Sequence, residues 1–179
     1  MNKKRLILNQ PLLDITLKRL CQQIIENHGL LDDVVFLGLQ PRGIFLAERI
    51  CKALSEELNK DIRPGYLDAT FYRDDFRRKG TLLTPNTTQI SFIIEDKNVI
   101  LIDDVLATGR MVRAAIDAMQ AFGRPKKVEL LCLIDRSYSR DLPIQPDYVG
   151  KRVNTLETQR VLVEWKEQQN AEDNIWIID

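Results

Sequence analysis

The stretch from Val99 to Met111, VILIDDVLATGRM, constrains the fold of this chain more than any other. Four apolar residues end at two adjacent carboxylates, Asp103 and Asp104, and the polar turn at residues 107–110 then opens a segment of helical period. A continuous apolar run is typical of a parallel strand buried on both faces. Ligands of open α/β sheets bind beyond the carboxyl ends of such strands, where a helix N-terminus presents N–H groups to an anion. The stretch therefore predicts a phosphate site beside two acids, which suits a sugar phosphate with free hydroxyls.

A second strand–turn–helix unit precedes this one, and its turn carries a basic residue. The apolar run from Val34 to Leu39 leads into the turn Gln-Pro-Arg-Gly at 40–43 and then into an amphipathic helix. The other predicted elements are a helix with apolar positions from Leu13 to Ile24, a helix from Val112 to Met119, and strands at Tyr66–Tyr72, Val128–Asp135, 160–165 and 174–179. This alternation predicts a parallel α/β sheet with right-handed crossovers. The long polar stretch at 73–89 predicts a lid.

The composition excludes several classes of function. A chain of 179 residues predicts a single domain over 1–179. Its 26 basic and 26 acidic residues cancel, so any RNA binding must use a local basic patch. Three widely spaced cysteines within apolar patterns are typical of buried free thiols in a reducing compartment. The sequence shows no signal peptide and no run of transmembrane length, so we expect a cytoplasmic protein without membrane contacts.

The central stretch resembles the phosphoribosyl-diphosphate (PRPP) motif of type I phosphoribosyltransferases. In that motif a strand, two acidic residues and a Thr-Gly turn are followed by a helix, and residues 99–111 match this order in register. The resemblance implies the type I phosphoribosyltransferase fold, an α/β fold with a central parallel sheet flanked by helices and a small C-terminal hood. The lid would then span about residues 73–89 and the hood about residues 136–179.

The resemblance also implies roles for the residues of the motif. Asp103 and Asp104 would bind the 2′ and 3′ hydroxyls of PRPP, directly or through water on a Mg²⁺ ion that PRPP carries, with no direct metal ligand from the protein. Carboxylates placed there also stabilise an oxocarbenium-like transition state. The residues expected to wrap the 5′-phosphate are Val105, Leu106, Ala107, Thr108, Gly109 and Arg110. On local features alone, an acidic turn with a purely structural role is the alternative.

The turn at 40–43 resembles the pyrophosphate loop of the same family. Gln40, Pro41, Arg42 and Gly43 would bind pyrophosphate, with Arg42 gripping its oxygens bidentately and Gly43 admitting a close backbone approach. Pro41 stands where the family has Thr or Ser, and we expect the Gln40–Pro41 peptide to be cis. An ordinary Pro-Arg-Gly helix start is the alternative. Arg73, at the start of the lid, would be catalytic by closing over the diphosphate.

Motifs outside the central stretch narrow the family. The segments Y-R-D-D at 72–75, D-R at 135–136 and D-L-P-I-x-x-D-Y-V-G-K at 141–151 resemble the bifunctional pyrimidine-operon regulators, the PyrR proteins. This resemblance implies a uracil phosphoribosyltransferase that forms UMP and pyrophosphate from uracil and PRPP. It also implies binding of pyrimidine-operon leader mRNA under the control of UMP or UTP. Asp135, Arg136 and Val153 would bind the substrate base.

RNA binding is the part of this resemblance from which the chain departs most. The candidate RNA contacts are Lys18, Arg19, Arg140 and Lys151, on a face that a homodimer or higher oligomer would double. The Ser-Tyr-Ser segment at 137–139 looks one residue longer than the family pattern, Gln145 replaces a frequent Arg, and Gln22 replaces a His. Two alternatives therefore stay open: an RNA-binding regulator that uses the nucleotide site only as a sensor, and a purine phosphoribosyltransferase, against which the hood sequence argues.

Overall fold

The computed structural model describes residues 4–74 and 85–179, and its core is a five-stranded parallel sheet of order β3-β2-β4-β5-β6. Its strands are β2 (Val34–Leu39), β3 (Gly65–Leu67), β4 (Asn98–Leu106), β5 (Lys127–Arg136) and β6 (Tyr148–Val153). The connecting helices are α1 (Gln10–His28), α2 (Gly43–Leu58) and α3 (Arg110–Met119). The predicted α/β class is confirmed, because the continuous apolar runs of β2, β4 and β5 are buried between helices.

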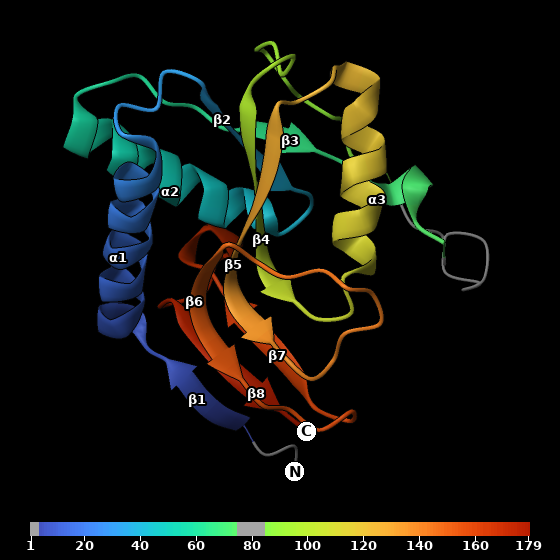
Figure 1. Cartoon of the computed structure of the whole chain (residues 1–179). Helices are drawn as coiled ribbons and strands as arrows, with labels where there is room; N and C mark the ends of the chain where they lie inside the picture. The colour runs from blue at the N-terminus through green and yellow to red at the C-terminus, as the bar shows by residue number, and fades with distance from the viewer. Residues whose placement is uncertain (1–3, 75–84) are drawn as a thin grey trace.

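Helices cover both faces of the sheet. Figure 1 shows α1 and α2 on one side and α3 on the other. Two separate apolar clusters fill these layers, one beneath α1 and α2 and one beneath α3. The N-termini of α1 and α3 are capped differently. The Asn9 side chain accepts the N–H of Leu12 at the start of α1, whereas Gly109, with a φ of 85°, is the cap residue of α3. Alternate residues of β4 reach the two clusters, as expected for a central strand.

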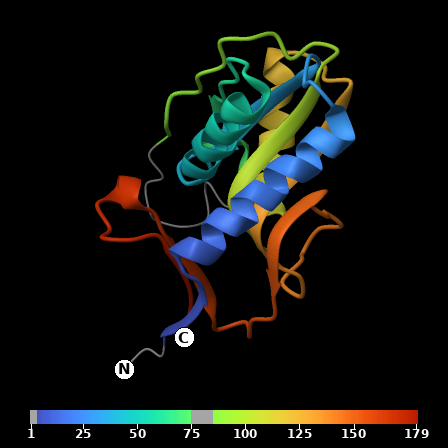
Figure 2. The same ribbon diagram turned by 90° about the vertical axis from the view of Figure 1, so that its left-hand side faces the viewer.

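A second, antiparallel sheet of order β1-β8-β7 forms the hood. Its strands are β1 (Lys4–Leu8), β7 (Arg160–Glu164) and β8 (Asn174–Ile178). In Figures 1 and 2 this sheet lies beside the carboxyl ends of β4 and β5, with the first described strand and the C-terminus next to each other. Val163, Trp165 and Ile175 anchor the hood in the cluster beneath α1 and α2. The hood therefore recruits an N-terminal strand in addition to the expected C-terminal ones.

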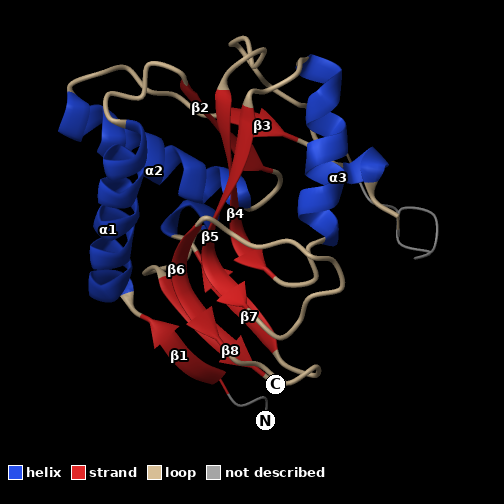
Figure 3. Ribbon diagram, in the orientation of Figure 1, coloured by secondary structure: helices blue, strands red, loops and turns tan. Residues whose placement is uncertain are grey.

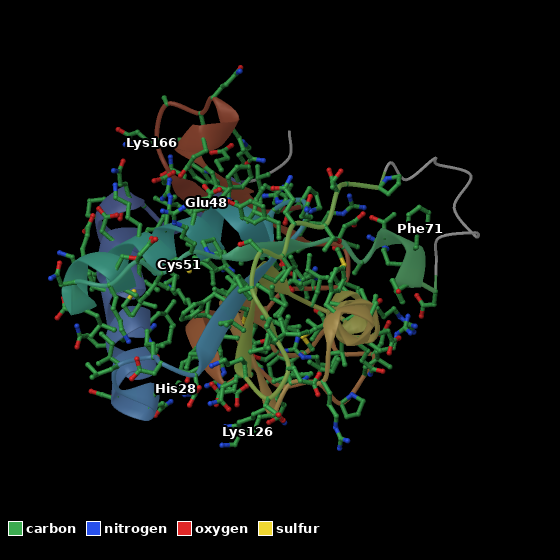
Figure 4. The ribbon with its side chains drawn as sticks, turned by 90° about the horizontal axis from the view of Figure 1, so that it is seen from above. His28, Glu48, Cys51, Phe71, Lys126 and Lys166 are labelled. Atoms are coloured by element: carbon green, nitrogen blue, oxygen red, sulfur yellow. The ribbon has the colours of Figure 1, made fainter. Side chains whose placement is uncertain are left out.

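A buried polar cluster ties α1 to the edge of the main sheet. His28, at the C-terminal end of α1 (Figure 4), places Nε2 2.7 Å from Glu129 Oε2 and 3.2 Å from the Tyr148 hydroxyl. The Tyr148 hydroxyl also donates to Glu129 Oε2 over 3.0 Å. These contacts join α1, β5 and β6 at the end of the sheet remote from the hood.

Two sequence predictions need correction, and two are confirmed. The strand predicted at Tyr66–Tyr72 ends at Leu67, because the Asp68 carboxylate accepts the N–H of Thr70 and starts a 3₁₀ turn at Thr70–Tyr72. Strands β1 and β6 were not predicted. The Gln40–Pro41 peptide is cis, as expected. The three cysteines are free and buried, also as expected. No helix within 4–74 and 85–179 is long and apolar enough to cross a membrane.

Candidate active site

The three loops that carry the predicted site residues meet at the carboxyl ends of β2, β4 and β5. These strands are neighbours in the sheet, so the segments at their carboxyl ends, 40–43, 103–110 and 135–147, lie at the same end of the sheet (Figure 3). The hood sheet lies across this end. The first and last of these segments begin 95 residues apart, at residues 40 and 135, and are brought together by strand order alone.

The paired carboxylates at the end of β4 are buried and unequally neutralised. Asp103 is 9% exposed and Asp104 5% exposed. Asp104 Oδ2 accepts a hydrogen bond from Arg42 Nε over 2.8 Å, and the Asp104 N–H donates to Asp103 Oδ1 over 2.9 Å. Burial, and after it the charge of Asp104, raise the pKa of Asp103 well above its usual range. The pair therefore stores an electrostatic cost that a hydroxyl donor or a cation at the site would relieve.

This cost predicts that Asp103→Asn stabilises the fold. A carboxyl whose pKa is raised on folding favours the unfolded state once the pH exceeds its unfolded pKa, and the penalty grows as pH rises through the folded pKa. The amide keeps an oxygen for the Asp104 N–H but carries no charge. We expect the variant to unfold at a higher temperature than wild type at pH 7, by about 2–4 °C per kcal/mol relieved. Calorimetry at pH 7 and pH 4 tests this, because the difference between the two proteins should shrink at pH 4; a lower Tm at pH 7 would contradict it.

The 40–43 loop is held against β4 and against the hood. Arg42 donates from its terminal nitrogen Nη2 to the Val163 carbonyl on β7 over 2.6 Å, in addition to its bond with Asp104. The Gln40 side chain donates to the Thr87 carbonyl over 2.7 Å. Gly43 lies so close to β4 that an added Cβ would stand 2.4 Å from the Ile102 carbonyl oxygen. The loop thus connects the paired acids, the hood and the C-terminal end of the predicted lid.

The 105–109 turn joins β4 to the N-terminus of α3. The Thr108 hydroxyl accepts the N–H of Arg110 over 3.3 Å, and Gly109 adopts a left-handed φ of 85° that admits the sharp turn. The Arg110 guanidinium faces two carboxylates, Asp141 Oδ2 at 2.9 Å and Asp74 Oδ2 at 2.5 Å. The backbone of this turn and the first turn of α3 are where the sequence predicts the binding of an anion.

A pocket of about 410 Å³ opens between this turn and the hood. Its lining residues are Ala107, Thr108, Arg136, Tyr138, Ser139, Arg140, Asp141, Thr155 and Glu157. Arg136 is fixed there by the Thr155 hydroxyl at 2.8 Å and the Gln159 carbonyl at 2.9 Å. Sequence reasoning did not single out Thr155 or Glu157, because the hood loops that carry them have no periodicity and no motif.

Two residues expected at the base, Asp135 and Val153, are not among the residues that line this pocket. Asp135 is buried and accepts hydrogen bonds from Arg140 and from the Ser137 hydroxyl, with Arg152 3.5 Å away. Val153 is buried and packs in the cluster beneath α1 and α2. Asp135 instead lines a neighbouring pocket of about 400 Å³ with the 137–147 loop and Arg152, and Val153 lines a surface hollow between β1 and β6.

The lid falls partly outside the described residues, which stop at residue 74 and resume at residue 85. Arg73 follows the 3₁₀ turn and donates its N–H to the Thr70 carbonyl over 3.4 Å. The two ends of the predicted lid are bonded to the candidate site, one through the bond of Asp74 with Arg110 and the other through the bond of Thr87 with Gln40.

The four candidate RNA contacts divide into two groups. Lys18 and Arg19 are exposed on α1, and Lys151 is exposed on the adjacent strand β6. Arg19 donates to the Gly150 carbonyl over 2.6 Å, which places α1 and β6 on one face. Arg140 belongs elsewhere: it lies beneath the 137–147 loop with only 18% of its side chain exposed.

Comparison with known proteins identifies the class. The phosphoribosyl transferase domain family model matches residues 6–168. The crystal structure of a hypoxanthine phosphoribosyltransferase of Trypanosoma cruzi superposes with a TM-score of 0.70 at 14% identity, covering 97% of this chain and 95% of the other, which shows a shared fold. A hypoxanthine-guanine phosphoribosyltransferase of Bacillus anthracis gives 0.62 at 17% identity, covering 86% and 85%. The chain belongs to the phosphoribosyltransferase family and has its type I fold.

Within this family the chain is similar to a particular group. It is 45% identical over 163 residues to the Bifunctional protein PyrR of Desulfosudis oleivorans, covering 91% of this chain and 90% of that protein. It is 44% identical over 170 residues to the Bifunctional protein PyrR of Streptococcus agalactiae, covering 93% and 94%. Identity at this level over nearly the whole length places the chain among the PyrR proteins, as its motifs predicted.

Proposed function

We propose that this protein is a uracil phosphoribosyltransferase, which transfers the ribose 5-phosphate of PRPP to N1 of uracil and releases pyrophosphate. The observation that carries the proposal is the buried pair Asp103–Asp104, which lies between the 40–43 loop, through its bond with Arg42, and the 105–109 turn that begins α3. PRPP has the matching sequence of groups: a diphosphate, two ring hydroxyls and a 5′-phosphate. Similarity to PyrR proteins supports uracil as the base.

The residues present would act mainly by positioning and by charge. The 105–109 turn holds the 5′-phosphate, and Arg42 holds the diphosphate, so that the anomeric carbon faces the hood pocket. Asp103 and Asp104 accept hydrogen bonds from the ribose hydroxyls and stabilise positive charge as the bond to pyrophosphate breaks. Arg73, at the start of the lid, adds positive charge over the leaving group. Uracil N1 attacks the anomeric carbon and loses its proton to solvent or to a phosphate oxygen, because no described residue stands out as a general base.

A Mg²⁺ ion fits this site as a companion of the diphosphate. Among the described residues no cluster of three or more Asp, Glu, His or Cys side chains could hold a metal alone. The adjacent oxygens of Asp103 and Asp104 nevertheless suit a hydrated hard cation, since only one arginine neutralises the pair. Bound with PRPP, the ion would neutralise charge on the departing pyrophosphate.

Nucleotide binding tests the proposed choice of base. We expect UMP to bind more tightly than CMP, AMP, GMP or IMP. Ribose 5-phosphate lacks a base, so its affinity measures the contribution of the ribose and the phosphate alone. Dissociation constants for these six ligands, measured with Mg²⁺ present, separate the two contributions. Preference for IMP or GMP would favour a purine phosphoribosyltransferase instead.

We also propose a second activity, binding of pyrimidine-operon leader mRNA under the control of UMP or UTP. Two observations support it: the relatives are named bifunctional, and Lys18, Arg19 and Lys151 form a basic face on α1 and β6. Arg5 and Lys151 also line a surface hollow of about 400 Å³ between β1 and β6. The sequence predicts a homodimer or higher oligomer, which would double this face. Size-exclusion chromatography with light scattering measures the oligomeric state.

The Lys18→Ala variant tests the basic face. Because Lys18 is exposed, its loss should leave folding and uracil turnover unchanged. If Lys18 contacts an RNA phosphate, the affinity for a leader hairpin should fall and the slope of log K against log salt should decrease by about 1. Lys52→Ala removes another exposed lysine, on α2, and serves as the control. Equal, weak binding of leader and scrambled hairpins, insensitive to UMP, would leave only the enzyme.

A further inference from the structure

Arg140 has an unusual set of partners for a residue in a surface loop. Its Nε donates to the Ile144 carbonyl over 2.8 Å, and one terminal nitrogen donates to the carbonyls of Ala107 over 2.6 Å and of Leu106 over 3.4 Å. The other terminal nitrogen pairs with the buried Asp135 carboxylate. The guanidinium therefore bridges the 105–109 turn and the 137–147 loop, with Asp135 fixing its orientation.

The neighbouring carbonyl of the same turn is held from the same side. The N–H groups of Asp141 and Leu142, in the 137–147 loop, both donate to the Thr108 carbonyl, over 3.0 and 3.1 Å. Three successive carbonyls, those of Leu106, Ala107 and Thr108, are thus pinned towards the 137–147 loop. The Ile144 side chain packs on Gly109, where an added Cβ would stand 3.3 Å from it.

Pinned carbonyls determine where the N–H groups of the turn point. In a trans peptide the carbonyl of one residue and the N–H of the next point in opposite directions. The three pinned carbonyls therefore direct the N–H groups of Ala107, Thr108 and Gly109 away from the 137–147 loop, onto a common side. Successive N–H groups that converge in this way form an anion-binding concavity. Arg140 fixes two of the three peptide units that make it.

We propose that Arg140 is a positioning residue for the 5′-phosphate: it orients the N–H groups of the 105–109 turn by holding the carbonyls behind them. The proposal rests on the proposed function for the identity of the ligand. It also replaces the role that the sequence suggested, a direct RNA contact, because the donors of this guanidinium already face protein acceptors. A lysine cannot substitute, since one ammonium lacks the planar fork that serves both loops at once.

Binding of two partial ligands tests the proposal. Ribose 5-phosphate probes the 105–109 turn, whereas pyrophosphate probes the 40–43 loop, which Arg140 does not contact. We expect Arg140→Ala and Arg140→Lys each to weaken ribose 5-phosphate and UMP by about tenfold or more while pyrophosphate binding stays within twofold of wild type. KM for PRPP should rise by the same factor. Arg152→Ala is the matched control, because Arg152 lies 3.5 Å from the same Asp135 carboxylate but is 69% exposed.

The outcomes are distinguishable. Unchanged ribose 5-phosphate binding in both Arg140 variants, together with a lower salt slope for RNA binding, would overturn the proposal in favour of a direct RNA contact. Equal losses for ribose 5-phosphate and pyrophosphate would show a general structural role and would also overturn it. Should Arg140→Ala fail to fold, Arg140→Lys, which keeps the charge, provides the same comparison. A wild-type protein that binds ribose 5-phosphate but does not convert uracil would contradict the proposed function and leave this test intact.

Discussion

Asp103→Asn and Asp104→Asn should each lower turnover of uracil and PRPP by about 10²-fold or more. Asparagine has nearly the same shape as aspartate, so the hydrogen bond between the Asp104 N–H and the side-chain oxygen at 103 can persist. What is lost is negative charge at the point where the ribose ring becomes positive in the transition state. The loss should appear mainly in kcat, because the stabilised charge exists only in the transition state. Steady-state kinetics with both substrates varied measures it.

The loss of activity should come without loss of stability. At position 103 the variant should even be more stable at neutral pH, since the buried charge is removed. Asp33→Asn is the control: Asp33 is exposed, pairs with Lys97 over 2.8 Å and precedes β2, at the opposite end of the strands from the paired acids. Turnover at the wild-type rate in both Asp103→Asn and Asp104→Asn would show that this acidic turn is structural.

Gly43→Ala should disable the 40–43 loop. A Cβ at this position would stand 2.4 Å from the Ile102 carbonyl oxygen and 3.1 Å from the Asp103 Cα, so the start of α2 must move away from β4. Overpacking of this kind costs about 1–3 kcal/mol of stability. The displacement also carries Arg42 away from Asp104, and we expect KM for PRPP to rise by about tenfold or more. Thermal unfolding and PRPP titration measure the two effects.

Gly29→Ala separates these two effects. Gly29 ends α1 with a φ of 63°, and an added Cβ there would meet nothing within 4 Å. Alanine is strained in this backbone conformation, so the variant should lose stability while its turnover per folded molecule stays unchanged. If Gly43→Ala behaves in the same way, its steric contact with β4 does not matter for PRPP, and the assigned role of the loop is wrong.

The part of the site that the sequence predicts is the part that is local. The apolar run at the start of β4, the acids that follow it and the Gly109 turn all lie within thirteen residues, so one motif predicts their arrangement. The central strands of the sheet can also be predicted from the sequence. Both faces of β2, β4 and β5 are buried, so each of these strands is a continuous apolar run.

What the sequence does not predict depends on long-range contacts. Strand β6 carries Gly150, where an added Cβ would stand 2.3 Å from the Leu133 carbonyl, and only pairing with β5 makes this segment a strand. From the sequence alone Arg140 resembles any exposed basic residue, because its hydrogen-bond partners are up to 34 residues away in the chain. Its role follows from where the 137–147 loop folds back, which no local pattern encodes.

The most direct test of the proposed uracil phosphoribosyltransferase activity is a competition between bases. Wild-type protein, PRPP and Mg²⁺ are incubated with uracil, cytosine, adenine, guanine and hypoxanthine at equal concentrations, and the nucleotides formed are separated and quantified. We expect UMP as the dominant product, in equal amount to the pyrophosphate released, and a rate of formation of both that is lower by about 10²-fold or more in Asp103→Asn. Formation of IMP or GMP in place of UMP, or binding of UMP with no nucleotide formed from any base, would contradict it.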